Sequence, residues 1–157
     1  MNGNETATRR HDRGFTLIEL MVVVLIIAIL LGIAIPTFLG AQNKAKDRSA
    51  QSSAKIALTN AKTIYADTGL YTGATDVALA AIEPALTFVA LTTSTGAKSV
   101  SVKTSADTWY GAVKSETGTC FYIKDSIATP CGTTFAKDTA ATTCVADAAG
   151  VVYGAGW

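Results

Sequence analysis

The chain has 157 residues, with 13 Lys or Arg, 12 Asp or Glu, and 49% hydrophobic residues. Because three of the positive and two of the negative side chains lie in residues 1–14, the rest of the chain carries ten of each sign. This neutral body argues against salt-dependent wrapping of nucleic acid, which needs an excess of Lys and Arg to neutralise phosphates.

The one histidine, His11, also lies in the first 14 residues. The body therefore has no imidazole for a Ser-His-Asp triad, a Cys-His nucleophile or a zinc site with histidine ligands. It also has neither of the two common glycine-rich phosphate motifs. We expect no enzymatic activity, no cofactor and no metal site.

A long apolar segment follows this leader. Between Phe15 and Asn43 the one charged side chain is Glu19, and Leu20–Ile35 holds sixteen residues without a polar side chain. As a helix, that core spans about 24 Å, and its apolar neighbours extend it towards the ~30 Å of a bilayer interior. We therefore predict a membrane-spanning helix, which satisfies its backbone polar groups internally. The alternative, a buried core helix, is disfavoured because the remaining sequence is too polar to surround it.

Charges on the two sides of this segment predict its orientation. Arg9, Arg10 and Arg13 precede it, whereas the first positive side chain after it is Lys44. By the positive-inside rule, the N-terminus stays in the cytoplasm and the rest of the chain is exported. The cysteines would then lie in an oxidising compartment, where a disulfide persists.

Two interpretations of this N-terminal region compete: a cleaved secretory signal, and a helix that stays in the protein after a leader is removed. A secretory signal needs small residues at a cut after the apolar segment, and Leu39-Gly40-Ala41 fits that pattern poorly. A charged residue in a membrane helix costs up to ~2.5–3.5 kcal/mol on insertion scales, which makes Glu19 a functional candidate. Its alternative role is to reach the membrane interface, because it lies only four residues inside the segment.

The residues Arg13-Gly14-Phe15-Thr16-Leu17-Ile18-Glu19-Leu20, followed by the apolar segment, resemble the class III signal of type IV pilins and pseudopilins. The strong match covers residues 9 to about 65. The resemblance implies that prepilin peptidase cuts after Gly14 and methylates the new N-terminus at Phe15. It also implies that Glu19 pairs with the Phe15 amine of a neighbouring copy and sets the axial register of a filament. Burying these two charges together is tolerable, whereas burying either alone is costly.

Pro36, with Gly32 one turn before it, predicts an interruption of the helix, because proline lacks an N–H group and glycine weakens the same turn. In filaments of the family that it resembles, the corresponding stretch is often unwound. After the charged residues at 44–48, apolar residues recur at spacings of three and four up to Tyr65. We predict an amphipathic continuation over residues 41–67, with Gly69 just after its end. The charges at 44–48 are either a solvated face or a contact with lipid headgroups or a neighbouring subunit.

Residues 68–84 are predicted to form a connecting loop with a short helix at 76–82. Alternating segments at 85–91, 98–103, 107–114 and 119–124 then predict about four short strands, which the short breaks between them make antiparallel. The apolar stripe of the helix is expected to cover one face of this sheet, with Trp109 and Phe121 in the core.

From Ser126 the chain becomes rich in Ala, Thr and Gly, so we expect a disulfide to hold this tail. Three pairings are open among Cys120, Cys131 and Cys144, and loop-closure entropy differs by only ~0.6 kcal/mol between the two that involve Cys120. We favour Cys120–Cys144, because it ties most of the tail to the sheet.

The sequence thus predicts an α+β fold: a leader at 1–14, a membrane helix at 15–40, its amphipathic continuation at 41–67, a loop at 68–84, and an antiparallel sheet with a disulfide-tethered tail at 85–157. The resemblance implies a structural subunit of a type IV pilus, which exists first as a single-pass membrane precursor and then in an extracellular filament. Its implied partners are copies of itself, prepilin peptidase and the pilus assembly platform. One alternative is a pseudopilin of a type II secretion system, and another is a membrane-anchored extracellular binding module.

Overall fold

The computed structural model describes residues 14–157 and divides into two units at Gly40/Ala41, each of which is considered by itself. Helix α1, Leu17–Thr68, begins in the first unit and ends in the second. Its end has a clear local cause. Gly69 adopts a φ of 74°, a conformation that costs glycine little, and its N–H donates to Tyr65 O at 2.7 Å.

In the second unit, α1 is followed by a short 3₁₀ helix η1 (Tyr71–Gly73) and by α2 (Asp76–Ile82), where the sequence predicts a short helix. Thr75 caps α2, since its side chain accepts from the Ala78 N–H. Five strands complete the fold: β1 (Thr87–Ala90), β2 (Ser99–Thr104), β3 (Thr108–Lys114), β4 (Cys120–Ser126) and β5 (Gly132–Asp138). The fold class is α+β, as predicted.

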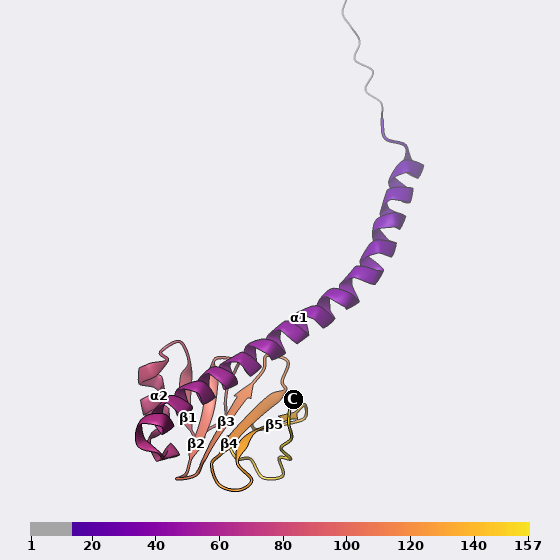
Figure 1. The fold of residues 1–157 in the computed structure, drawn as a ribbon. Coiled ribbons are helices and arrows are strands. Elements are labelled where there is room, and N and C mark those ends of the chain that lie inside the picture. Colours follow the sequence, from indigo (N-terminus) through magenta and orange to yellow (C-terminus); the bar gives the residue numbers. More distant parts are fainter. Residues whose placement is uncertain (1–13) are drawn as a thin grey trace, which may run out of the picture. The chain divides into compact units, whose positions relative to one another are not determined.

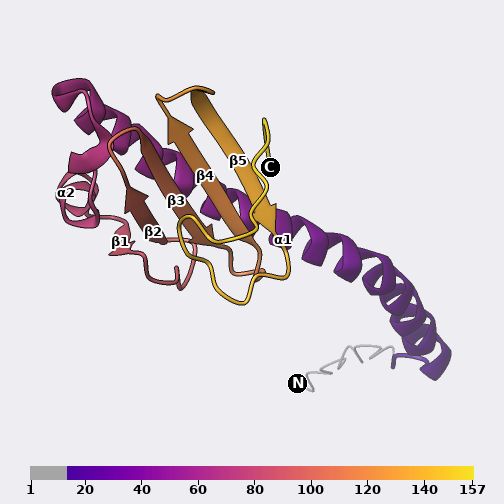
Figure 2. The same cartoon turned by 90° about the horizontal axis from the view of Figure 1, so that it is seen from below.

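The strands form one sheet in the order β1-β2-β3-β4-β5 (Figure 2). β2 to β5 are antiparallel neighbours, but β1 pairs parallel to β2. The prediction of an all-antiparallel sheet was therefore wrong at this edge. Only four residues of β1 are paired, and they span about 13 Å. The eight connecting residues 91–98 can span about 26 Å when extended. That length is sufficient to return to the start of β2.

Strand β5 is a second correction, because the sequence predicted a tail without strands after Ser126. Its sequence, GTTFAKD, contains one large apolar residue, Phe135, and so lacks the hydrophobic content by which the other strands were recognised. β5 pairs along its whole length with β4, and Phe135 also exchanges two hydrogen bonds with Gly154. Backbone pairing to β4 therefore stabilises β5, a strand that its composition alone does not predict.

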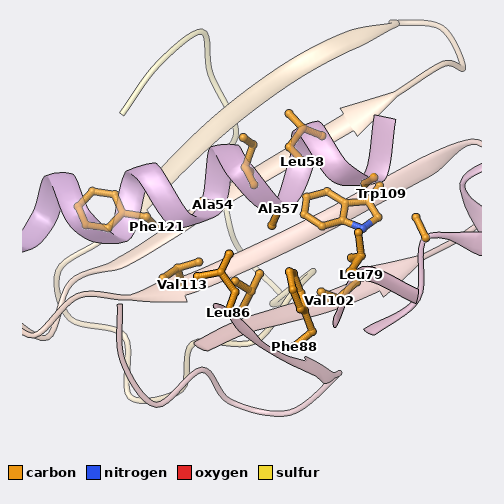
Figure 3. Close-up of a cluster of buried hydrophobic side chains, with 14 of the residues drawn as sticks. Ala54, Ala57, Leu58, Leu79, Leu86, Phe88, Val102, Trp109, Val113 and Phe121 are labelled. Atoms are coloured by element: carbon orange, nitrogen blue, oxygen red, sulfur yellow. The ribbon is translucent and has the colours of Figure 1, made fainter. Parts of the chain in front are cut away.

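The second half of α1 lies across one face of the sheet (Figure 1), as the apolar stripe predicted. The helix contributes small residues to this contact, with Ala50, Ala54, Ala57 and Ala61 fully buried. The sheet contributes larger residues, and α2 and the segment before β1 complete the core (Figure 3). The large buried residues opposite the helix are Leu79, Leu86, Phe88, Val100, Val102, Trp109, Val113, Phe121 and Ile123. Trp109 and Phe121 are core residues, as expected.

Gly111 has a packing role beside Trp109. A Cβ atom at Gly111 would lie 2.6 Å from the indole ring of Trp109, which is a severe overlap. The large indole and the missing side chain are thus complementary, and the indole fills the space beneath α1 without displacing the strand.

The opposite face of the sheet is covered by the tail. Ala112, Cys120, Tyr122 and Ala136 form a second buried cluster with Cys144. A disulfide joins Cys120 to Cys144, with their Cα atoms 5.6 Å apart, which confirms the favoured pairing. Cys131 is exposed and outside this bond.

We predict that replacing both Cys120 and Cys144 by serine lowers the free energy of unfolding by about 2–4 kcal/mol, because the unfolded chain regains the freedom of a closed loop. Urea denaturation of the full chain in detergent measures this. Cys131→Ser is the matched control and should leave the midpoint unchanged. A destabilisation by Cys131→Ser that equals that of the double variant would contradict the assigned pairing.

Candidate functional site

The apolar residues of the first unit are exposed. From Phe15 to Leu39 the large apolar side chains keep between 43% and 76% of their surface accessible, and α1 is the one helix in residues 14–157 that is long and apolar enough to cross a membrane. Soluble proteins rarely leave an apolar patch of such length uncovered. An exposed apolar surface of this length is suited to contact with lipid or with another protein chain.

The N-terminal end of the helix is organised by Thr16. Its Oγ1 accepts a hydrogen bond from the Glu19 N–H at 3.2 Å, while Gly14 and Phe15 precede the helix. Thr16-x-x-Glu19 is the spacing of a capping box, in which a hydroxyl satisfies a free backbone donor of the first turn. This role was missed at the level of sequence, although the Thr-x-x-Glu spacing is visible in the printed sequence. An acidic side chain in the first turn also complements the helix dipole.

The predicted pairing of Glu19 with an amine at Phe15 needs a cleaved chain and a second copy, and so stays a prediction. Glu19 is exposed, and it forms no ion pair within residues 14–157. Residues 1–13, with Arg9, Arg10 and Arg13 on which the predicted orientation depends, lie outside the described part of the chain.

At Gly32 and Pro36 the helix does not break: α1 is helical throughout, with Pro36 inside it. The next residue, Thr37, donates its hydroxyl to Ile33 O at 3.2 Å and to Ala34 O at 2.9 Å. Proline removes only one backbone donor, so the bonds on either side keep the turn. Local unwinding here stays a prediction for the assembled state.

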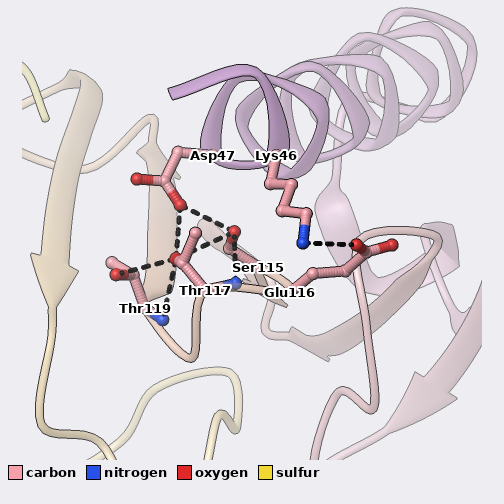
Figure 4. Close-up of polar contacts among 6 residues, drawn as sticks. All are labelled: Lys46, Asp47, Ser115, Glu116, Thr117 and Thr119. Atoms are coloured by element: carbon pink, nitrogen blue, oxygen red, sulfur yellow. Dashed lines mark hydrogen bonds and ion pairs between the residues drawn. The ribbon is translucent and has the colours of Figure 1, made fainter. Parts of the chain in front are cut away.

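In the second unit, two of the charged residues at 44–48, Lys46 and Asp47, contact the turn between β3 and β4 (Figure 4). Asp47 Oδ1 accepts from Ser115 Oγ at 2.7 Å and from Thr117 Oγ1 at 2.5 Å. Lys46 Nζ lies 3.6 Å from a Glu116 carboxylate oxygen in an exposed pair, which contributes little to stability. The hydroxyl contacts of Asp47 are therefore the main polar tie between α1 and this turn.

A second tie is centred on Asp125, which is 5% exposed. Its carboxylate accepts from the Tyr71 and Thr133 hydroxyls and from Lys62 Nζ, which lies 3.0 Å from Oδ1. Burial disfavours the charged form of Asp125, but these three donors outweigh burial and hold its pKa below the ordinary value. Burial, together with the hydrogen bond to Asp125, raises the pKa of Tyr71. This cluster joins α1, η1, β4 and β5.

The carboxylates at 125, 138 and 147 do not form a metal site. Asp125 is paired with Lys62, and Asp147 with Lys103 on the other side of the sheet. Within residues 14–157 there is no group of three His, Cys, Asp or Glu side chains that is close enough to hold a metal ion.

The structure thus defines a class of protein. An apolar helix with a capped first turn continues into the second unit, residues 41–157, where it packs on the sheet; we call this α+β unit the head. The family model described as the prokaryotic N-terminal methylation motif matches residues 9–35. The chain is also similar to the type IV major pilin protein PilA of Myxococcus xanthus, with 44% identity over 61 residues, which are 39% of this chain and 28% of that protein. The chain thus covers less than a third of the length of that relative. No solved structure matches the chain.

These matches confirm the resemblance that the sequence indicated. The chain has the N-terminal methylation motif over residues 9–35, and the apolar helix that follows it is similar to the corresponding part of a type IV major pilin. Its α+β head, built on the second half of the same helix and tied by a disulfide, lies mostly outside these matches.

We predict that Asp125→Asn lowers the free energy of unfolding by about 1–3 kcal/mol at pH 7 and by much less at pH 3. The sign follows from the pKa of Asp125. Since that pKa is lower in the folded than in the unfolded state, ionised Asp125 stabilises the fold above the unfolded value of about 3.9, and this contribution is lost as the pH falls through the folded pKa. Urea titrations at the two pH values measure it, and an equal loss at both would contradict the assignment.

Proposed function

We propose that this chain is the structural subunit of a type IV pilus. Its precursor lies in the membrane as a single-pass protein with a cytoplasmic N-terminus, prepilin peptidase removes residues 1–14, and Phe15 becomes the methylated first residue. The pilus assembly platform then adds the subunit to a surface filament through residues 15–40. Such a filament serves adhesion, twitching motility or DNA uptake. The chain itself catalyses nothing, and Gly14 and Phe15 are substrate positions for the peptidase.

The observation that carries this proposal is the uncovered apolar helix, whose side chains from Phe15 to Leu39 are exposed. In the membrane, lipid covers this surface, and in a filament the equivalent helices of other copies cover it. Helix packing of this kind consists of many weak dispersion contacts, which become strong only as a sum over several neighbours. An assembly of this type can therefore be extended and withdrawn one subunit at a time.

Glu19 supplies the specific element in an otherwise uniform apolar surface. Once Gly14 is removed, the amine of Phe15 lies four residues from Glu19, so both charges sit at the first turn of the helix. In the apolar core of a filament neither charge has water, and each needs a partner of opposite sign. Pairing between copies satisfies both and selects one axial offset among the many that apolar contacts allow.

The mature N-terminus tests the processing step. We predict that mass spectrometry of the native protein finds a chain that begins at N-methylated Phe15. A chain that begins at Met1 supports an uncleaved membrane anchor, and a chain that begins near Gln42 supports a secretory signal. Either result would exclude the proposed processing. Electron microscopy of sheared surface material then separates long pili from the short periplasmic assembly of a pseudopilin.

A substitution series at Glu19 separates its two candidate roles. The observed cap uses the Glu19 backbone N–H, which both substitutions retain. Glutamine keeps a polar side chain of the same length without the charge, whereas alanine removes the polar group as well. We predict that Glu19→Gln and Glu19→Ala are both cleaved normally and both reduce filament yield about tenfold or more, since truncating one partner of a buried charge pair costs ~2–5 kcal/mol.

The measurements are the ratio of cleaved to uncleaved chain in membranes and the amount of subunit in sheared filaments. Glu19→Asp is the control that retains the charge, and it should assemble better than Glu19→Gln. If Glu19→Gln assembles as well as the unchanged protein, the charge of Glu19 does not set the register.

A further inference from the structure

Helix α1 carries a stripe of positive side chains along the exposed side of its second half. Lys44, Arg48 and Lys55 are exposed, and their spacings of four and seven residues place them within about 40° of arc around the helix. The residues that pack against the sheet, such as Ala54 and Ala57, lie on a different side of the helix. Lys44 and Arg48 therefore lie away from the core of their own head, whereas Lys55 lies beside Trp157, which packs against that core.

The acidic side chain nearest to this stripe does not neutralise it. The carboxylate of Asp47 points to the segment between β3 and β4, where the hydroxyls of Ser115 and Thr117 donate to it. Within residues 14–157, Lys44, Arg48 and Lys55 form no ion pair, although the Lys55 ammonium lies 5.3 Å from the centre of the Trp157 ring. The head thus presents a line of positive charge that lacks an acidic partner of its own.

Helix α1 ends at the opposite end of the head (Figure 1), and the residues around that end include acidic ones. The hydrogen bond of 3.1 Å from Tyr71 N to Ala106 O brings the segment after α1 beside the β2–β3 turn. Asp67 and Asp107 lie close to that bond in sequence and are exposed, and Asp76, which is half-buried, is the first residue of α2. None of these three carboxylates is in an ion pair in the described part of the chain.

The two groups of opposite charge cannot meet within one head. On one continuous helix, Asp67 is 12 positions from Lys55 and 23 from Lys44, which corresponds to about 18 Å and about 35 Å at 1.5 Å per residue. Both distances are at least two Debye lengths at physiological salt, so direct pairing of these charges needs a second copy.

We propose that the Lys44–Arg48–Lys55 stripe of one copy binds the acidic end of a second copy, formed by Asp67, Asp76 and Asp107, and so orients the heads in an assembly. This inference rests on the proposed function, because it concerns contacts between copies. Each exposed pair contributes little by itself. Complementary charges mainly steer encounter and fix the register, and like charges brought together by a wrong register are repelled.

Anionic lipid headgroups are the competing partner of such a stripe. Lys44 and Lys55 are about 16 Å apart along the helix, whereas the headgroup layer on one side of a bilayer is only about 5–8 Å thick. A helix that leaves the membrane therefore carries Lys55 beyond this layer. The length of the stripe favours a protein partner.

A charge-swap series in cells that use the full chain as their filament subunit tests this proposal. We expect Lys44→Glu/Arg48→Glu and Asp67→Lys/Asp107→Lys each to be cleaved normally and to reduce filament yield about tenfold, a change of about 1.4 kcal/mol in the assembly equilibrium. Combining all four substitutions should restore at least half of the yield. The matched control, Lys98→Glu/Lys137→Glu, alters the net charge equally at exposed lysines elsewhere and should assemble normally.

Normal assembly of either reversed pair, or a combination without recovery, would overturn the proposal. If only the stripe reversal impairs assembly, lipid or another protein is its partner, and the proposal also fails. Formation of the Cys120–Cys144 bond in each variant shows that the head has folded.

A second measurement does not depend on filaments, and so separates this inference from the proposed function. A mixture of unlabelled and ¹⁵N-labelled full-length chain is placed in phosphatidylcholine vesicles and treated with a carbodiimide, which joins lysines to carboxylates in direct contact. We expect mixed-isotope peptides that link Lys44 or Lys55 to Asp67, Asp76 or Asp107. If these links are absent while other lysine–carboxylate links between copies form, the pairing is wrong, whether or not the chain makes pili.

Discussion

The structure depends on one constraint: within the described part of the chain, the 18 large apolar side chains from Phe15 to Leu39 are exposed. Their exposed area is far larger than the patches that soluble monomers tolerate, so water is not a stable environment for them. The proposed function supplies two environments for this helix, lipid before assembly and other copies after it. The proposed leader removal and the proposed role of Glu19 both concern the transfer of this surface from one environment to the other.

In the head, by contrast, the sheet covers one side of the second half of α1. Alanines on the helix allow the sheet to approach closely, and Trp109 fills the space that remains beneath the helix. Polar ties at Asp47 and Asp125 then fix the helix at two points along its length. The second half of α1 is therefore an integral part of the second unit.

Sequence reasoning was most reliable where the physical signal is local. The apolar segment, the stripe up to Tyr65, the stop at Gly69 and the helix at 76–82 are all readable from composition and spacing, and the structure has each of them. The Cys120–Cys144 bond could be favoured but could not be proved from the sequence, because three cysteines leave three pairings open.

Sequence reasoning failed where residues that are distant in sequence decide the local structure. The parallel direction of β1 depends on how much of that strand is paired, and β5 forms because β4 offers it a complete backbone partner. The ties at Asp47 and Asp125 join residues more than 50 positions apart, and no local pattern predicts them. The Thr16–Glu19 cap is different, since its spacing was visible and was overlooked.

Hydrogen exchange on sheared surface filaments tests the central claim most directly. If the apolar helix is retained and covered by other copies, the amides of residues 17–31 exchange far more slowly in filaments than in full-length chain held in detergent. Filaments without these residues, or filaments in which these amides exchange as fast as in the detergent-held chain, would contradict the account.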